Sequence, residues 1–508
     1  MGIQNFQKYL RTTYPSAHKE SWLDKYDNLY VDLNYVLHHI CYVSNSKQDI
    51  LLRTKDYLIN IIKYTNPQKR IIIVADGPAP LAKLILQRKR RLDKVDICDN
   101  KQFNEDAHLE INFTPGTQFM LSLEDNLSDF KTYIETTYNL NVIISITEPD
   151  EGEIKIRKRL QDIQNDNLTE SHIVYSGDSD MILLLFTCHK LDNIYMTPNN
   201  NKFLSLNELY NSHIQKFGKT DNTKYDFVFI NLLMGNDYIP KVMYITLDKI
   251  WNTYAKISKY YTNGLISYNY NSIKLDPIFL HDLLYLTSKN IAKGYLNRFK
   301  LIHLREKYYN NYIEGLYWCF GMYITGDCSD YRYIYNYKKS PHITGIMLSL
   351  IANNTYNIAK SKSIDSTLYG ILLIPNKASI ILSSKNRQIA CIVEKKYPII
   401  YEEEKCKKCQ KYKKQLLNLN KCRKNIEINT PERITINKDI KKAFNSYTKH
   451  KNKHEQLTYD TIDDINRYYN ICSWNIIELD NDTKKEKNTE QYIPPNIRNI
   501  NRFKKRLF

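Results

Sequence analysis

The sequence lacks the segments that would carry the chain into or across a membrane. No apolar run reaches the roughly 20 residues that a transmembrane helix needs, and the opening MGIQNFQKYLRTTYP has no apolar core of a secretion signal. Phe6 stands where a myristoylation signal has a hydroxyl residue. We therefore expect a soluble protein that works in the cytoplasm, with the nucleus as the alternative location.

The sequence also lacks the cysteine pattern of a disulfide framework. Its ten cysteines are spread irregularly over 508 residues, whereas secreted disulfide-rich domains are short and dense in cysteine. This usage indicates a reducing compartment.

Acidic residues are few relative to basic ones. Lys and Arg number 73 against 55 Asp and Glu, which gives a net charge of +18 and a pI near 9.1. Such a balance suits a polyanionic partner, and nucleic acid is the first candidate. The alternative is general solubility with a basic tail. The length leaves room for two or three globular domains.

The chain predicts an α/β fold with a mostly parallel central sheet flanked by helices. Apolar, β-branched runs at 28–32, 70–76, 142–147 and 173–175 read as strands, and helical patterns such as 5–14, 50–64 and 80–93 alternate with them. Ligands of such sheets gather at the carboxyl ends of the strands. Acids stand at that end of all four strands, and the apolar segment 225–237 ends in a seventh: Asp32, Asp76, Glu151, Glu153, Asp178, Asp180 and Asp237.

The run HIVYSGDSDMILLL at 172–185 indicates a candidate metal site most clearly. Asp178 and Asp180 lie between two apolar segments, where carboxylates are costly to bury without a cation. A helix cap made by Asp178 is the alternative for this stretch alone. Four acid-terminated strands in succession favour a metal site instead.

Carboxylate oxygens without matching histidines or thiolates select Mg²⁺, with Mn²⁺ as a substitute, over zinc. Seven carboxylates exceed the needs of one ion and suit two ions about 3.5–4 Å apart, the arrangement used for in-line phosphodiester hydrolysis.

The helix that follows Asp76 is basic on one face. Lys83, Gln87, Arg90 and Arg91 lie at i, i+4, i+7 and i+8. These groups could hold a terminal phosphate, for which arginine offers bidentate hydrogen bonds. A solvated basic helix is the alternative.

At this point the chain resembles the Xrn-type 5′→3′ exoribonucleases, which have a PIN/flap-endonuclease-like nuclease fold. The resemblance covers roughly residues 1–400 and rests on these stretches in order: MGIQNFQKYL, NLYVDLNYVLHH, DGPAPLAKLILQRKRRL, FTPGTQFM, DEGEIKIRKRL, YSGDSDMILLLFTCH, DFVFINLLMGNDYIPK, YIEGLYWCF and LYGILLIPNKASIIL. We expect a short member of the family, without the long C-terminal extension of the large cytoplasmic members.

The resemblance implies roles for particular residues. The seven acids would be catalytic metal ligands for two Mg²⁺ ions. Lys83, Gln87, Arg90 and Arg91 would form a pocket for the 5′-monophosphate of single-stranded RNA, and His38 would stack on the first base. The family's tryptophan-rich run is replaced here by GDCSDYRYIYNY at 326–337, so Tyr331 or Tyr333 could stack opposite His38.

Two other functions stay open from the sequence. A flap-endonuclease-type 5′ DNA nuclease usually has a glycine-rich helix-hairpin-helix after the last acid, which GNDYIPKVMYITLDKIW lacks. A non-catalytic RNA-binding protein would not need seven intact acids.

We expect four regions in the chain. They are a nuclease core at 1–245, a mainly helical region closing the active site at 246–400, a basic cysteine-containing segment at 401–480 and a disordered basic tail at 481–508. In the third region Cys406, Cys409 and Cys422, with His450 and His454, could hold zinc, although their spacing fits no standard finger. The alternative is a basic, partly helical surface segment.

Overall fold

The computed structural model describes residues 3, 5–21, 23–96, 106–198, 202–269, 272–288, 306–335, 337, 339–352, 360–400, 406–424, 426–427, 430–451 and 460–469. The chain divides into two compact units, Met1–Tyr459 and Asp460–Phe508. In the second unit the described residues form one helix at 460–469. The predicted tail at 481–508 lies outside the described residues.

A seven-stranded sheet forms the centre of the first unit, in the order β1-β7-β6-β5-β2-β3-β4. The four inner pairings, β6 with β5, β5 with β2, β2 with β3 and β3 with β4, are parallel, and β7 and β1 add two antiparallel pairings at one edge. The predicted mostly parallel α/β fold is confirmed. The strands are β1 (His18–Lys19), β2 (Tyr26–Asp32), β3 (Pro67–Val74), β4 (Asn141–Ser145), β5 (His172–Tyr175), β6 (Ile194–Thr197) and β7 (Phe203–Ser205).

The strand order reverses next to β2. From β2 the chain adds β3 and β4 on one side and then β5 and β6 on the other. Ligands of open α/β sheets bind outside the carboxyl ends of the strands at such a reversal. The register pairs Asp32 with Val74 and Val31 with Tyr175, so the ends of β2, β3 and β5 lie at one edge of the sheet.

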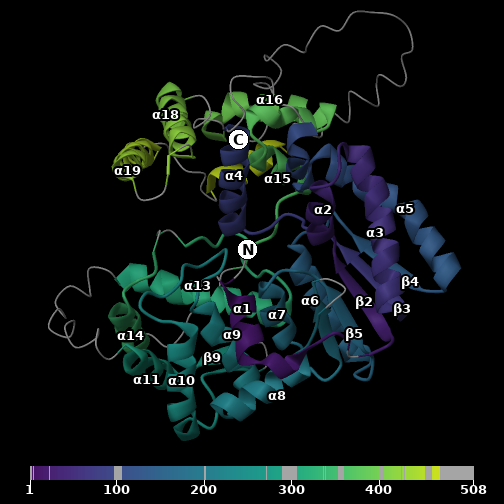
Figure 1. The fold of residues 1–508 in the computed structure, drawn as a ribbon, viewed down its shortest axis with the longest axis vertical. Helices are drawn as coiled ribbons and strands as arrows, with labels where there is room; N and C mark the ends of the chain where they lie inside the picture. Colours follow the sequence, from purple (N-terminus) through teal and green to yellow (C-terminus); the bar gives the residue numbers. More distant parts are fainter. Residues whose placement is uncertain are drawn as a thin grey trace, which may run out of the picture. The chain divides into compact units, whose positions relative to one another are not determined.

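Helices cover both faces of the sheet (Figure 1). Alternate residues of a strand point to opposite faces; in β2, Leu29 and Val31 pack with α2, α3 and α5, whereas Tyr30 packs with α6, α7 and α9. Burial on both faces explains why these strands are continuously apolar. The helices are α1 (Phe6–Thr13), α2 (Leu33–Cys41), α3 (Lys47–Thr65), α4 (Leu81–Asp96), α5 (Gln118–Tyr138), α6 (Gly152–Asp166), α7 (Asp180–Phe186), α8 (Leu206–Phe217) and α9 (Thr223–Leu232).

Beyond residue 245 the described part of the chain is mainly helical, as expected. A short hairpin of β8 (Ile266–Asn269) and β9 (Ser272–Leu275) interrupts the helices. The helices are α10 (Leu247–Ile257), α11 (Pro277–Thr287), α13 (Glu306–Thr325), α14 (Ile343–Ala352), α15 (Ser366–Leu373), α16 (Ser384–Lys396), α18 (Lys407–Lys424) and α19 (Pro431–Lys451). The boundaries at 245, 400 and 480 stay predictions.

The apolar helix α13 joins the main core. Trp318 on this helix is only 1% exposed and donates its indole N–H to the carbonyl of Asp330 at 2.9 Å. Trp318 therefore belongs to the core. Among the described residues, no helix combines the length and the apolar character that a membrane span requires.

A buried histidine makes the fold sensitive to acid. Nδ1 of His213 on α8 is hydrogen-bonded to the Tyr14 hydroxyl at 2.8 Å. The imidazole ring lies edge-on to the ring of Trp251. Burial lowers the pKa of its imidazole from 6.5 to about 3. The stability that comes from keeping this ring neutral is complete above pH 6.5 and is lost as the pH falls through the window between 6.5 and about 3.

We therefore expect the free energy of unfolding to fall with acidification by up to about 1.4 kcal/mol per pH unit from this group. His213→Gln keeps a hydrogen-bond partner for Tyr14 but does not titrate. Urea denaturation of both proteins between pH 7 and 4 measures the difference, and equal pH slopes would contradict it.

Candidate active site

Local hydrogen bonds hold the acids at the ends of β2 and β5. Asp32 caps helix α2, since its carboxylate accepts from the backbone N–H of Tyr35 at 3.1 Å and from the Ser176 hydroxyl at 2.9 Å. The Asp178 carboxylate accepts from the backbone N–H of Asp180 at 3.0 Å. This bond supports the start of α7, but the N-cap residue is Ser179 rather than Asp178. The charge of Asp178 acts on Asp32, so the two acids lie near each other at the sheet edge.

Two loops bring the acids after β3 and β4 together. The Asp76 carboxylate accepts from the backbone N–H of Gly152 at 2.8 Å, at the start of α6. The backbone N–H of Gly77 donates to the carbonyl of Asp150 at 2.8 Å. Strand β3 ends at Val74 rather than at the predicted residue 76, so Asp76 lies in this loop, where its charge acts on the carboxyl group of Glu151.

Gly77 is required for this close approach. A Cβ at this position would collide with the backbone carbonyl of Glu148, whereas a Cβ at Gly152 would lie at an ordinary 3.5 Å from the Asp76 carboxylate. We expect Gly77→Ala to cost about 1–3 kcal/mol of stability by overpacking and to displace the acids on both loops. Thermal melting and Mg²⁺ titration of Gly77→Ala beside Gly152→Ala measure both effects. Equal behaviour of the two variants would refute the assigned role of Gly77.

Two cations of α4 reach the acids directly. The Lys83 ammonium lies 2.5 Å from the Glu151 carboxylate and 2.8 Å from that of Asp237, and the Arg90 guanidinium lies 3.2 Å from Asp237. The Tyr238 hydroxyl also donates to Glu151. The basic face of α4 therefore adjoins the carboxylates.

Burial and mutual repulsion disfavour the charged state of most of these acids. Burial, and then the charge of Asp76, raises the pKa of Asp32 to about 7. Burial is also the main cause that raises the carboxyl pKa of Glu151, Glu153 and Asp180, and neighbouring acids add to it. Lys83 opposes the rise at Glu151 without overcoming it.

The carboxyl pKa of Asp237 is shifted in the opposite direction. Burial works against its ionisation, but Lys83 and Arg90 outweigh this effect and lower its carboxyl pKa. Burial likewise works against the charge of Lys83, yet Glu151 and Asp237 raise the ammonium pKa well above its usual value. The site contains more carboxyl groups than these two cations can balance, and this is the electrostatic condition under which further cations would bind and favour the charged carboxylates.

The donor set fits hard divalent ions. All seven positions offer carboxylate oxygens, the ligand type that Mg²⁺ and Mn²⁺ prefer. No three of the seven have oxygens that all lie within 4.8 Å of one another.

The other predicted phosphate ligands lie along the same helix. Gln87 accepts from the Tyr369 hydroxyl of α15 at 3.2 Å, and the Arg91 guanidinium donates to the Thr114 hydroxyl at 2.7 Å. Burial lowers the pKa of Arg91, which is nevertheless far above neutrality for a guanidinium. Contacts from two distant segments thus orient the basic face.

His38 lies next to this helix. Its ring packs edge-on against Phe113, with centroids 5.2 Å apart. Burial and then the nearby Arg91 lower its pKa, so the imidazole is neutral at physiological pH. An uncharged ring beside the basic face is compatible with base stacking.

The two tyrosines expected to stack opposite His38 have other contacts in the structure. The Tyr331 hydroxyl donates to the carboxylate of Asp150, and the Tyr333 ring stacks on Trp318 with centroids 4.6 Å apart. Which aromatic side chain faces His38 stays open.

Several side chains at the site were not found from the sequence. Tyr238 directly follows Asp237, and Lys155 follows Glu153 by two residues, so proximity could have indicated both. The Lys155 ammonium donates to the carbonyl of Ala75 at 2.9 Å, and burial lowers its pKa to about 8. Thr114 and Tyr369 come from remote segments and had no local signal.

Solved structures similar to the chain include nucleases. The catalytic core of Rad2 in complex with DNA substrate matches with a TM-score of 0.35 at 14% identity, covering 69% of this chain and 100% of that one. The bacteriophage T5 D15 flap endonuclease, in complex with DNA and metal ions, matches with a TM-score of 0.30 at 15% identity, covering 46% and 74%.

Curated relatives are named exoribonucleases. The human 5′-3′ exoribonuclease 1 is 27% identical over 51% of this chain and 19% of its own length. The Saccharomyces cerevisiae 5′-3′ exoribonuclease 1 is 22% identical over 62% and 24%, and the Eremothecium gossypii 5′-3′ exoribonuclease 2 is 33% identical over 32% and 21%. The alignments thus span about a fifth to a quarter of these relatives.

A family model matches the N-terminal part of the chain. The model of the XRN 5′-3′ exonuclease N-terminus matches residues 1–197. This segment contains six of the seven acids and the entire basic face of α4. Residues 1–197 of this chain are therefore similar to the N-terminal region of the XRN 5′-3′ exonucleases.

Proposed function

We propose that this protein is a Mg²⁺-dependent 5′→3′ exoribonuclease that degrades 5′-monophosphorylated single-stranded RNA and releases mononucleotides. The observation that carries the proposal is the contact between two features: Lys83 and Arg90 of the basic α4 face reach Asp237 of the carboxylate site. This contact occurs in a chain whose N-terminal residues match the exonuclease family.

This contact brings the face that would bind the 5′ phosphate next to the carboxylates that would hold the metal ions. A 5′-terminal phosphate on the face of Gln87, Arg90 and Arg91 would place the first phosphodiester bond at the carboxylates. Arginine is suited to such a phosphate because its planar guanidinium donates two parallel hydrogen bonds. Binding the end of the strand next to the reacting bond would set the polarity of degradation.

The acids would hold the ions. Two bound Mg²⁺ ions, replaceable by Mn²⁺, would supply an activated water and charge stabilisation for the leaving oxygen. Lys83 neutralises part of the negative charge at Glu151 and Asp237, and the hydrogen bonds to Asp32, Asp76 and Asp178 fix the directions of their carboxylates. His38 would orient the first base.

The proposal is tested with purified protein, Mg²⁺ and one RNA sequence prepared with a 5′-monophosphate, a triphosphate, a cap or a hydroxyl. We expect rapid decay of the monophosphate form only, and none in EDTA. Equal decay of all four RNAs would remove the pocket assignment. Preference for a DNA flap would indicate a structure-specific DNA nuclease, and binding without cleavage a non-catalytic RNA-binding protein.

A further inference from the structure

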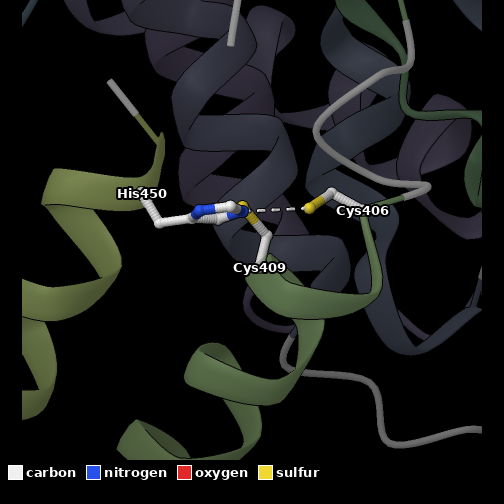
Figure 2. Close-up of side chains that lie close together, drawn as sticks. All are labelled: Cys406, Cys409 and His450. Atoms are coloured by element: carbon white, nitrogen blue, oxygen red, sulfur yellow. Dashed lines mark hydrogen bonds between the residues drawn. The ribbon is translucent and has the colours of Figure 1, made fainter. Parts of the chain in front are cut away.

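Three potential zinc ligands converge in the C-terminal part of the first unit. Cys406 precedes α18, Cys409 lies in its first turn, and His450 lies in the last turn of α19. Figure 2 shows the three side chains pointing toward one another, Cys409 and His450 from the two helices and Cys406 from the residue before α18. Their ligand atoms all lie within 4.8 Å of one another, and the Cys406 sulfur is 3.3 Å from Nε2 of His450.

These separations suit a tetrahedral zinc ion. Zn–S bonds of about 2.3 Å and Zn–N bonds of about 2.0–2.1 Å place a sulfur and a nitrogen ligand about 3.6 Å apart and two sulfurs about 3.8 Å apart. Two thiolates with an imidazole are also the soft and borderline donors that select zinc over Mg²⁺. The geometry points to a structural zinc site formed by Cys406, Cys409 and His450, distinct from the carboxylate site.

The helical hairpin explains how ligands roughly 40 residues apart in the sequence meet. Helices α18 and α19 pack against each other and are joined by the short segment 425–430, which makes them antiparallel neighbours. At 1.5 Å per residue, the 18 residues of α18 span about 27 Å, and the 20 residues from Pro431 to His450 span about 30 Å. The start of one helix therefore lies beside the end of the other.

The environment favours thiolates and a fixed imidazole. At the start of α18, the backbone N–H groups of Lys408 and Cys409 and the positive end of the helix dipole lie beside the Cys406 sulfur, which stabilises its negative charge. Cys409 is fully buried. The ring of Tyr412 packs against that of His450 with centroids 6.2 Å apart, which restricts the orientation of the imidazole.

Few of the described side chains of the hairpin are buried and apolar. Its buried apolar side chains among the described residues of α18 and α19 are Cys409, Ile436 and Ala443. Since binding to the folded chain adds directly to stability, a metal that joins the two open ends would supply what the small core does not. A structural zinc site normally takes four ligands, so one position is left to a donor beyond these three.

Metal content of the purified full-length protein tests the site. The protein is expressed with zinc and then purified by gel filtration in EDTA. We expect elemental mass spectrometry to find one zinc ion per chain. Cys409→Ser and His450→Gln should lose it. Cys422→Ser is the matched control, because Cys422 is exposed and lies about 20 Å further along α18. Asp178→Asn should also keep its zinc, which separates this site from the carboxylates.

Cobalt provides a readout that does not depend on a variant folding. The wild-type protein loaded with Co²⁺ should show a sulfur-to-cobalt charge-transfer band, retained in Cys422→Ser and Asp178→Asn. A wild-type protein with neither bound zinc nor this band would overturn the proposal. Full zinc retention by Cys409→Ser, or a Cys406–Cys409 disulfide in zinc-free protein, would overturn it as well. Either result leaves the proposed nuclease activity untouched.

Discussion

Asp178→Asn is expected to lose RNA cleavage by more than about 100-fold, because one negative ligand is removed from a site that stabilises charge in the transition state. The amide keeps an oxygen that can accept from the backbone N–H of Asp180, so the start of α7 should remain intact. Binding of 5′-monophosphorylated RNA, measured by fluorescence anisotropy without metal, should be close to that of the wild type.

The matched control is Asp192→Asn. Asp192 is an exposed acid on the turn before β6, with its nearest cationic partner, Lys190, at 3.6 Å. The control loses the same charge outside the site and should keep full activity. An active Asp178→Asn enzyme, with kcat/KM within a few-fold of the control, would refute the metal-site assignment.

Arg91→Ala is expected to lower kcat/KM for 5′-monophosphorylated RNA by about 10- to 100-fold, since a charged hydrogen bond contributes about 1.5–3 kcal/mol. Decay of the same RNA with a 5′-hydroxyl should change little. The ratio of the two kcat/KM values is therefore the measurement, because a loss of folded protein would lower both equally.

Lys89→Ala is the control for this variant. Lys89 lies on the same helix with the same charge, but it is exposed and two residues before Arg91, which puts it on another side of α4. We expect its ratio of kcat/KM values to match the wild type. A ratio that falls equally in both variants would show a general effect of charge rather than a phosphate pocket.

Four of the five parallel strands, β2 to β5, could be predicted because they are largely buried between the two layers of helices, whereas the equally buried β6 was not predicted. Continuous runs such as Ile71–Ile73 and Ile173–Tyr175 indicate strands, and the acids that follow them stand out against that background. The edge strands β1 and β7 could not be predicted. They have two and three residues, which is too short for any periodic pattern.

Contacts between distant segments could not be read from the sequence either. The spacing of Lys83, Gln87, Arg90 and Arg91 predicts a shared helix face, but not that Thr114 and Tyr369 orient it. The proximity of Cys406 and His450 could not be predicted from the sequence either, because it is the helical hairpin that brings the two residues together. Cys422 had looked equally available as a ligand, and its position along α18 separates it from that group.

The direction of degradation tests the central claim most directly. One 5′-monophosphorylated RNA with a fluorophore at its 3′ end and a stable hairpin in its middle is incubated with the protein and Mg²⁺. We predict loss of the 5′ segment as mononucleotides, with a 3′-labelled fragment that ends at the hairpin. Early loss of the 3′ label, or internal fragments without mononucleotides, would contradict a nuclease that binds the 5′ phosphate beside its metal site.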